Sequence, residues 1–326
     1  MFKMKGICSI AVLLSVFVST TVFAADKKTI GVIKIVSHAA LDADEKGFEE
    51  AMAASGFKEG VNVIYDRQNA QGDPAKAAAI AQRFIDQKVD LVHSIATPTT
   101  QAVVKLTKSI SVVFSSVTDP ISAGIVPKDS ASGRKTGSNV TGVSDMLPVS
   151  LQMEMYVKIV PKAKKFGTIY NPAESNSVSL IKEMRVAAKK LGLELVEATV
   201  AGKKDVANAA VSLAGKVQAI AITSDNTAVS DLESIVKVCN EKKIPLFAGD
   251  IDSVARGVIA AYGLDYKLVG FYAGKKASLI LKGMNPGDIP WGPVEKFSLV
   301  INEKAANLQG VTVPPALLKK ADKVIK

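Results

Sequence analysis

Short apolar runs alternate with amphipathic stretches along the chain, and one such unit lies at residues 89–106. Residues 91–96 are apolar apart from His93 and Ser94, and after Thr97-Pro98 the apolar residues return at helical spacing. This pattern predicts a buried strand and then a helix, with Thr97 as the N-cap and Pro98 at the first helical position. Ligands of open α/β sheets bind where strands end and helices begin, and a helix N-terminus attracts a carboxylate. A Thr-Pro pair that only caps a helix is an equally good interpretation of this stretch.

A second unit at residues 217–236 repeats this order of elements. Its apolar run, residues 217–222, ends in Thr223-Ser224-Asp225-Asn226-Thr227, and a helical pattern follows. Each unit is followed by another predicted strand that ends in polar residues, at residues 115–120 and 249–253. The elements before the two units also agree in order and type. We therefore predict an α/β fold made of two doubly wound, Rossmann-like lobes of like topology.

The chain holds more predicted strands and helices than two complete units need. The simplest use of the extra elements is to let the chain cross between the lobes near Gly142, near Gly263 and within residues 289–293. Three crossings would form a multi-strand hinge that lets the lobes close on each other. We expect an N-terminal lobe of residues 25–143 plus about 266–288, and a C-terminal lobe of residues 144–265 plus about 289–326.

Residues 1–24 have the layout of a signal peptide. Lys3 and Lys5 precede an apolar run over residues 7–18, and a small-residue cleavage signal ends at Ala24. The apolar run is too short to span a bilayer. We expect cleavage after Ala24 and an exported protein that is soluble in the periplasm or otherwise extracytoplasmic.

Composition and charge exclude several classes of function. The 326 residues are 48% hydrophobic, which is enough for two packed lobes. Removal of Lys3 and Lys5 lowers the formal net charge from +10 to +8, and because the basic residues are scattered we expect no nucleic acid partner. Cys239 is then the remaining cysteine, and its helical pattern predicts a buried thiol. His38 and His93 alone make no metal set, and with no cofactor fingerprint in the chain we expect no metal and no cofactor.

Several short motifs stand out as a set. They are Thr97-Pro98-Thr99-Thr100-Gln101-Ala102, Val117-Thr118-Asp119-Pro120, Tyr170-Asn171-Pro172 with Glu174, Asn176 and Ser177, and Tyr262-Gly263-Leu264. Together they resemble the ABC-transporter substrate-binding family that includes tryptophan- and tyrosine-binding members, which has the type I periplasmic binding protein fold. The resemblance covers residues 29–313. It implies a protein that carries a ligand between its lobes to the permease subunits of an ABC importer.

The loops at the ends of the predicted strands, such as residues 37–42, supply candidate ligand-binding residues. Hydroxyl groups and helix starts suit a carboxylate and acidic groups suit an ammonium, so together they suit an α-amino acid. The N-terminal lobe offers Ser37, His38, Asp42, Thr97, Thr99, Thr118 and Asp119, and the C-terminal lobe offers Asn171, Glu174, Asn176, Ser177, Asp225, Asn226 and Asp250. We expect Thr97 and Thr99 to hold the carboxylate, and Asp225, aided by Glu174 or Asp250, to hold the ammonium. Asp119 shaping only a turn, and Asn176 and Ser177 capping only a helix, remain open alternatives.

We predict capture of a small molecule, an aromatic or apolar amino acid first of all, rather than catalysis. A nucleoside, a purine-like base or a small amine remains open as the ligand. The chain shows no nucleophile elbow and no Ser/His/Asp arrangement, so an exported α/β enzyme is the weaker alternative. A regulator with the same two-lobe fold would need a DNA-binding segment where this chain has its signal peptide. We expect a monomer whose lobes close on the ligand.

Overall fold

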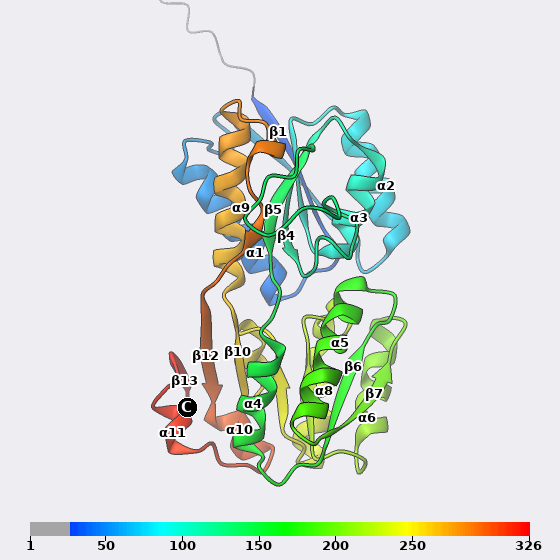
Figure 1. The fold of residues 1–326 in the computed structure, drawn as a ribbon, viewed down its shortest axis with the longest axis vertical. Coiled ribbons are helices and arrows are strands. Elements are labelled where there is room, and N and C mark those ends of the chain that lie inside the picture. The colour runs from blue at the N-terminus through cyan, green and yellow to red at the C-terminus, as the bar shows by residue number, and fades with distance from the viewer. Residues whose placement is uncertain (1–26) are drawn as a thin grey trace, which may run out of the picture.

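The computed structural model describes residues 27–326, so the predicted signal peptide lies outside the described residues. The chain forms two lobes that follow one another along the long axis of the molecule, each with helices packed around one sheet (Figure 1). Residues 27–326 contain no helix with the length and apolar character that crossing a bilayer requires.

The first lobe is built from two separate parts of the chain. Its elements are β1 (Lys28–Lys34), α1 (Ala39–Ala54), β2 (Val63–Asn69), α2 (Pro74–Asp86), β3 (Leu91–Ile95), α3 (Thr97–Leu106), β4 (Ser111–Val117), β5 (Val140–Ser144), α9 (Tyr266–Leu281), η3 (Pro286–Asp288) and β11 (Gly292–Pro293).

The second lobe is likewise discontinuous. Its elements are α4 (Val149–Ile159), β6 (Lys165–Tyr170), α5 (Ser175–Lys190), β7 (Glu194–Thr199), η1 (Lys203–Asp205), α6 (Val206–Leu213), β8 (Ala219–Ile222), α7 (Asn226–Ser230), α8 (Leu232–Lys242), β9 (Leu246–Ala248), η2 (Asp252–Arg256), β10 (Ala260–Leu264), β12 (Phe297–Asn302), α10 (Glu303–Leu308), α11 (Pro315–Leu318) and β13 (Lys323–Ile325).

Both sheets are open and almost entirely parallel. The strand order is β11-β5-β4-β3-β1-β2 in the first lobe and β13-β12-β10-β9-β8-β6-β7 in the second. Within residues 27–326, β10 with β12 is the one antiparallel pair. Parallel strands are buried on both faces, which explains continuous apolar runs such as β1, where Ile30, Val32 and Ile33 are each exposed by 1% or less. The predicted fold class of two doubly wound α/β lobes is confirmed.

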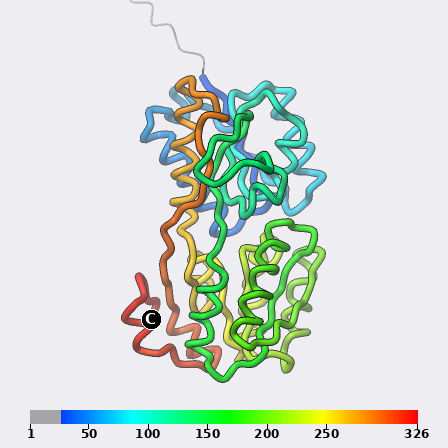
Figure 2. Tube along the Cα trace, in the orientation of Figure 1, coloured from blue at the N-terminus to red at the C-terminus, as the bar shows by residue number. Residues whose placement is uncertain are grey.

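Three segments connect the lobes on one side of the molecule, and they are clearest in the trace of Figure 2. They join β5 to α4, β10 to α9 and β11 to β12. Strand β11 still pairs with β5 in the first sheet, through Gly292 with Val143 and Pro293 with Ser144. The third crossing therefore follows Pro293, a few residues later than the sequence led us to expect. Three connections limit the relative motion of the lobes to a hinge.

Helices α1 and α9 pack closely because glycines face the contact. A Cβ atom at Gly270 would lie 1.8 Å from the carbonyl oxygen of Asp44, and one at Gly47 would lie 1.9 Å from the carbonyl oxygen of Lys267. Neither position tolerates a side chain without movement of a backbone. Since α9 begins at the second crossing, this contact fixes one hinge segment to the helix that follows β1.

The carboxyl ends of β3 and β4 hold two non-glycine residues with positive φ. Ala96 has φ +82° and Ser116 has φ +53°, and the pairing of β4 with β5 is irregular between Phe114 and Val117. The prediction that Thr97 caps the next helix is wrong, because Ala96 is the N-cap of α3 and Thr97 is its first residue. Backbone strain of this kind is held by its surroundings and concentrates at functional sites. Both residues lie at the end of the first sheet that faces the second lobe.

Candidate functional site

A cavity lies between the lobes, where the carboxyl ends of both sheets meet. Counted together with the solvent-open space at its mouth, the volume between its atoms is about 310 Å³. Its lining comes from both lobes: His38, Ala40, Leu41, Ser116, Thr118, Asp145, Asn176, Ser224, Asn226, Val229, Asp250 and Tyr266. This is the position at which ligands bind in open α/β sheets. We call it the inner cavity.

Asp145 is an acidic group at the hinge side of the inner cavity. It follows β5 at the first crossing and is 2% exposed. Its Oδ1 accepts a hydrogen bond from Thr118 Oγ1 at 3.0 Å, and its Oδ2 accepts one from Tyr266 Oη at 2.6 Å. Burial raises the pKa of Asp145, although both hydrogen bonds oppose this shift. Asp145 therefore connects β4 with the segments of the first and second crossings.

Asp250 is the second acidic group of the inner cavity, and it comes from the other lobe. It follows β9, is 2% exposed, and accepts hydrogen bonds from the backbone N–H and the hydroxyl of Ser253 at 2.8 and 2.7 Å. Within residues 27–326, no lysine or arginine nitrogen lies within 4.0 Å of either Asp145 or Asp250. The cavity thus holds two buried carboxyl groups without a protein cation in contact.

Three further polar atoms of the cavity lining are buried and have no hydrogen-bond partner among residues 27–326. They are His38 Nδ1, Asn176 Oδ1 and Ser224 Oγ. Burial lowers the pKa of His38 to about 4, against the attraction of Asp250, so its imidazole is neutral at pH 7. A buried polar atom without a partner costs about 1–3 kcal/mol. Their concentration around one cavity indicates a site that a polar ligand completes.

Glu174 and Asp225 stand at the start of α5 and α7, and neither lines the inner cavity because other groups of the protein occupy their oxygens. Asp225 Oδ2 accepts hydrogen bonds from the backbone N–H of Asn171 and the hydroxyl of Ser177, and its Oδ1 caps α7 through Ala228 N at 2.6 Å. Burial raises the pKa of Asp225 to about 7, with a further contribution from Glu174. Asp225 thus lies behind the cavity wall, where it fixes two loops together.

Glu174 is also occupied within its own lobe. Its two oxygens accept hydrogen bonds from the side chains of Asn176, Asn226 and Thr227 and from the backbone N–H groups of the last two. Glu174 therefore orients two amides that line the inner cavity. It also lines a neighbouring outer cavity of about 740 Å³ with Asn171, Ile35 and Pro98, and Asn226 borders both cavities.

Thr97, Thr99 and Asp119 also turn away from the inner cavity. Thr99 Oγ1 donates to the carbonyl oxygens of Ile95 and Ala96, and Thr97 Oγ1 accepts from the backbone N–H of Thr118 at 3.4 Å. Asp119 Oδ1 accepts from Ser122 N, which is the turn contact that the sequence left open. These side chains shape the strand ends of the first lobe.

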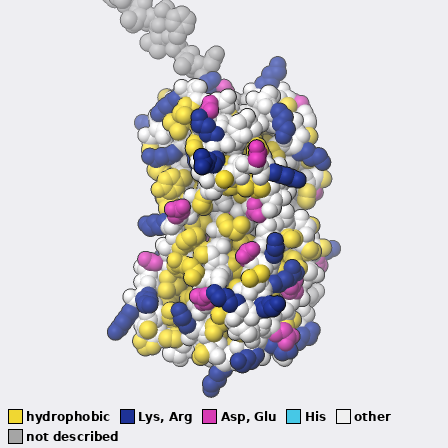
Figure 3. All heavy atoms as spheres, viewed as in Figure 1, with side chains coloured by type: hydrophobic (Ala, Val, Ile, Leu, Met, Phe, Trp, Pro, Cys, Tyr) yellow, Lys and Arg dark blue, Asp and Glu magenta, His cyan; other side chains and the backbone are white. Residues whose placement is uncertain are grey.

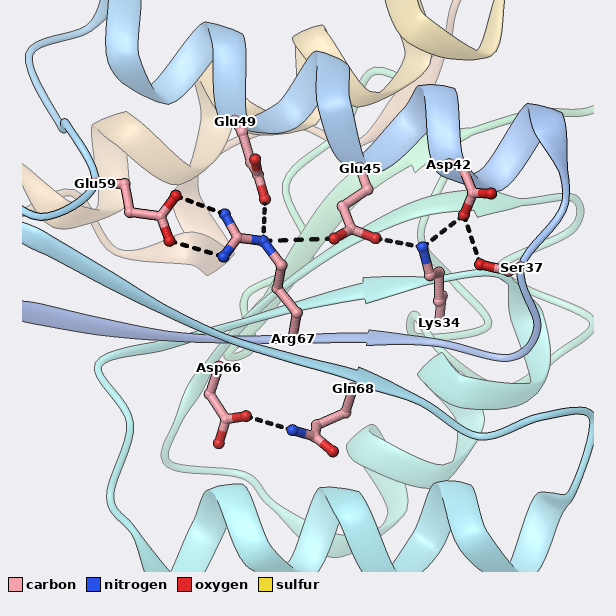
Figure 4. A network of polar contacts seen from close by, with 9 residues as sticks. All are labelled: Lys34, Ser37, Asp42, Glu45, Glu49, Glu59, Asp66, Arg67 and Gln68. Carbon is pink, nitrogen blue, oxygen red and sulfur yellow. Dashed lines mark hydrogen bonds and ion pairs between the residues drawn. The ribbon is translucent and has the colours of Figure 1, made fainter.

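Ser37 and Asp42 belong to a network of charged groups beside β1, shown in Figure 4. Asp42 Oδ1 accepts hydrogen bonds from Lys34 Nζ at 2.5 Å and from Ser37 Oγ at 2.8 Å. Lys34 also pairs with Glu45 at 2.7 Å, and Arg67 extends the network to Glu45, Glu49 and Glu59. The network lies between α1 and the strands β1 and β2 and does not line the inner cavity.

A second polar cluster lies beneath the inner cavity, in the core of the first lobe. Asp44 is fully buried and accepts hydrogen bonds from the hydroxyls of Ser115, at 2.8 Å, and Ser116. Ser115 also contacts His93 Nε2 at 2.8 Å, and the His93 ring stacks on Phe48. Burial raises the pKa of Asp44 to about 7 and lowers that of His93 to about 3. Asp44 thus holds the side chain of Ser116, whose backbone is strained.

The structure brings together part of the predicted set. The predicted residues that line the inner cavity are His38, Thr118, Asn176, Asn226 and Asp250, and those that do not are Ser37, Asp42, Thr97, Thr99, Asp119, Asn171, Glu174, Ser177 and Asp225. Sequence reasoning missed Ser116, Asp145, Ser224 and Tyr266. Asp145 follows a predicted strand, which is the same signal that identified Asp250. Ser116 lies in the polar segment 115–120 and Ser224 in the segment 223–227, both of which follow predicted strands.

No group of three or more His, Cys, Asp or Glu side chains with the geometry of a metal site occurs in residues 27–326. On the face shown in Figure 3, lysine and arginine side chains are spread over both lobes and do not form a patch. Cys239 is buried, as its helical pattern predicted.

A family profile and known relatives account for almost the whole described chain. The profile described as "ABC transporter substrate binding protein" matches residues 29–325. The chain belongs to this family. A curated protein named "Tyrosine-binding protein", from Clostridioides difficile, is 38% identical to this substrate-binding protein over 303 residues, which is 92% of this chain and 87% of the relative. The family comprises solute-binding proteins that act outside the cytoplasm with ABC transporters, and its fold is that of type I periplasmic binding proteins.

Two solved structures of similar identity show how the lobes of this substrate-binding protein are arranged. An ABC domain from Streptococcus pneumoniae in complex with L-Trp has 34% identity and a TM-score of 0.87, with 92% of this chain and 100% of that chain covered. A ligand-free, open substrate binding protein from Clostridium difficile has 33% identity and a TM-score of 0.66, with 92% and 99% covered. At almost equal identity, the higher score belongs to the ligand complex. The lobes described here are therefore arranged more like those of the complex than those of the open protein.

Proposed function

We propose that this protein captures an α-amino acid with an aromatic or apolar side chain, and that the ligand ammonium lies between Asp145 and Asp250 in the inner cavity. The observation that carries this proposal is the pair of buried carboxyl groups, one at the hinge beside the first lobe and one from the second lobe, with no lysine or arginine of residues 27–326 in contact. A buried charge is stable only when it is paired and hydrogen-bonded. A ligand cation would pair with both acids at once.

The position of the two acids also explains why the ligand would close the lobes. Asp145 is held from the first lobe by Thr118 and lies at the hinge, whereas Asp250 is fixed to the second lobe by Ser253. In the open state the two carboxyl groups are hydrated separately. A ligand shifts the equilibrium between open and closed states only through its different affinity for the two, and an ammonium that contacts both acids has that property.

The rest of the cavity suits the remaining parts of an amino acid. His38 and Ser224 have buried polar atoms without partners, and both can donate a hydrogen bond to a ligand carboxylate. Leu41 and Val229 give the cavity an apolar wall, and the outer cavity beside Asn226 provides further space. The relatives named for tyrosine and solved with L-Trp support an aromatic ligand.

The proposal extends to the export of the protein, its delivery of the ligand and the motion of its lobes. The signal peptide is cleaved after Ala24, and a soluble monomer outside the cytoplasm delivers its ligand to the permease subunits of an ABC importer without catalysis. The two lobes move as separate bodies about the three crossings. The first lobe comprises residues 28–144 with 266–293, and the second comprises residues 149–264 with 297–326. The strand pairings, which are confined to one sheet in each lobe, support this division.

Calorimetry with three related compounds tests the ligand class. L-Tryptophan and L-tyrosine should bind, whereas indole-3-propionate, which lacks the ammonium, should bind at least about 30-fold more weakly because the two acids stay unpaired. Tryptamine, which lacks the carboxylate, serves as the complementary compound. If indole-3-propionate binds as tightly as tryptophan, the ammonium site is wrong, and if tryptamine binds more tightly, a small amine replaces the amino acid as the ligand class.

Two substitutions test the assignment of the acids. Asp145→Asn and Asp250→Asn should each weaken tryptophan binding by about 30-fold or more. Asp119→Asn removes an acid of the first lobe that does not line the cavity, and it should leave affinity within about twofold. Equal affinities of all three variants and the parent would contradict the assignment.

A further inference from the structure

We propose that Lys34, Ser37 and Asp42 position His38 for contact with the ligand, so that this group of three, here called the β1–α1 clamp, determines ligand affinity without touching the ligand. The inference rests on the proposed function, because it concerns the same inner cavity. Its observations are separate: the charged network of Figure 4, and the position of His38 between Ser37 and Asp42 in the chain and in the lining of the inner cavity.

The clamp ties together the three elements that surround His38. Lys34 is the last residue of β1, Ser37 lies in the connecting loop, and Asp42 lies in the first turn of α1. Asp42 Oδ1 accepts a hydrogen bond from each of the other two side chains, at 2.5 and 2.8 Å. The backbone N–H of Asp42 also donates to the carbonyl oxygen of His38 at 3.0 Å. Residue 38 is therefore enclosed by contacts on both sides of it in the sequence.

The imidazole of His38 is hydrogen-bonded to Asn226 of the second lobe but caps no helix. His38 is the N-cap residue of α1, with φ −157° and ψ 166°, but its side chain makes no capping hydrogen bond. Its Nδ1 atom is buried at the cavity and has no hydrogen-bond partner among residues 27–326. Helix α1 also contacts η2 of the second lobe, and His38 directly precedes this helix in the lining of the inner cavity. The orientation of this imidazole therefore depends on Asn226 and on the backbone that bears it.

The charges of the clamp are placed to keep that backbone fixed. The side chain of Lys34 is 15% exposed and pairs with Asp42 and with Glu45, whose side chain is 13% exposed. Burial alone would lower the pKa of Lys34, but the hydrogen bonds with the two acids outweigh it and the pKa is raised. Lys34 is therefore charged throughout the neutral range. Partly buried pairs are screened by salt less than exposed pairs are.

The same strand offers a matched control at its other end. Lys28 begins β1 and pairs with Asp90 at 2.7 Å, with side-chain exposures of 46% and 30%. Both lysines are thus strand residues bonded to an aspartate, Lys34 to Glu45 as well, but Lys28 lies at the end of the sheet far from the second lobe. Surface pairs of this kind contribute little to stability. A difference in ligand affinity between a Lys34 variant and a Lys28 variant therefore reports on the binding site, and not simply on the loss of a lysine.

The first test measures the affinity of the full mature chain for L-tryptophan and L-tyrosine. Lys34→Met should weaken binding by about five- to tenfold, because one side chain of the site is no longer held in its bound orientation before the ligand arrives. Lys34→Arg keeps the charge and should restore affinity to within about threefold. Lys28→Met should change it by less than twofold. The ligand-free thermal midpoint should be nearly the same in all of them.

A double-mutant cycle decides whether the clamp acts through His38. His38→Gln should weaken binding, and adding Lys34→Met to it should cause no further loss. A full additional five- to tenfold loss in the double variant would overturn the proposal, since the lysine would then act independently of the imidazole. Equal affinity of Lys34→Met and the parent would also overturn it.

The outcomes separate this inference from the proposed function. If tryptophan binds and depends on Asp145 and Asp250 but not on Lys34, the function stands and the clamp fails. If the parent binds neither amino acid, the proposed function fails and the clamp fails with it.

Discussion

Asp44→Asn is the substitution whose effect on stability can be worked out most fully from the structure. Asp44 is fully buried in the first lobe, and its carboxyl group contacts two serine hydroxyls and no lysine or arginine among the described residues. Burial, opposed by those two hydrogen bonds, raises its pKa from 3.8 to about 7. Asparagine has nearly the same shape and can accept from one serine and donate to the other.

The sign of the pH dependence follows from the direction of this shift. Because the folded-state pKa is raised, the folded protein binds the proton more tightly than the unfolded chain does. The resulting stabilisation is complete below about pH 4 and is lost as the pH rises to about 7. A shift of about three units corresponds to about 4 kcal/mol in the free energy of unfolding. Asparagine does not titrate, so the stability of the variant relative to the parent should rise by about this amount from pH 4 to pH 8.

Urea unfolding of parent and variant between pH 4.5 and pH 8 measures this difference. Trp291, the one tryptophan of the chain, is 5% exposed and contacts the first lobe at Phe114, so its fluorescence reports on the lobe that holds Asp44. Asp86→Asn, at an exposed site on α2 of the same lobe, is the control and should run parallel to the parent. A difference between Asp44→Asn and the parent that stays constant with pH, or falls as the pH rises, would refute the reasoning.

Two further predictions concern helix packing and the closing of the lobes. Gly270→Ala should lower the free energy of unfolding, measured by heat or urea, by about 1–3 kcal/mol or more, because its Cβ would lie 1.8 Å from the carbonyl oxygen of Asp44. Gly202→Ala is the control: a Cβ there would have no atom within 4 Å, and the change should cost about 1 kcal/mol at most. Affinity for tryptophan should fall by up to tenfold per pH unit below about pH 6.5, because closure buries His38 and lowers its pKa to about 4. His38→Gln should flatten that profile in calorimetry at pH 5 and pH 7.5, and an unchanged slope would exclude His38 as its origin.

The order of elements was predictable because apolar periodicity is a local property of the sequence. Strand β3 and helix α9 could be identified from their own residues, and α9 covers residues 266–281 as its apolar pattern indicates. The start of α1 was less clear. Residues 37–42 were expected to be a loop, yet α1 begins at Ala39, so Asp42 lies in the first turn of the helix and reaches Lys34 instead of the cavity.

The site was only partly predictable because its side chains are oriented by contacts that are distant in sequence. His38 and Asp250 follow strands and reach the cavity as the topology predicts. Asp225 also follows a strand, but the backbone N–H of Asn171, 54 positions away, and the cap of α7 use its oxygens. Asp145 and Tyr266 were missed because they are 121 positions apart and meet only where two crossings run side by side.

The discontinuity of the first lobe has a consequence for the order in which the chain can fold. Thr141 in β5 donates to the carbonyl oxygen of Ile289, 148 positions later, and α9 supplies the cover for α1. A growing chain that ends before residue 266 would leave that face of α1 and the edge of β5 open to water. By contrast, strands β6 to β10 of the second lobe are consecutive in the sequence. We therefore expect the first lobe, which must close a loop of 148 positions, to complete its fold more slowly than the second lobe.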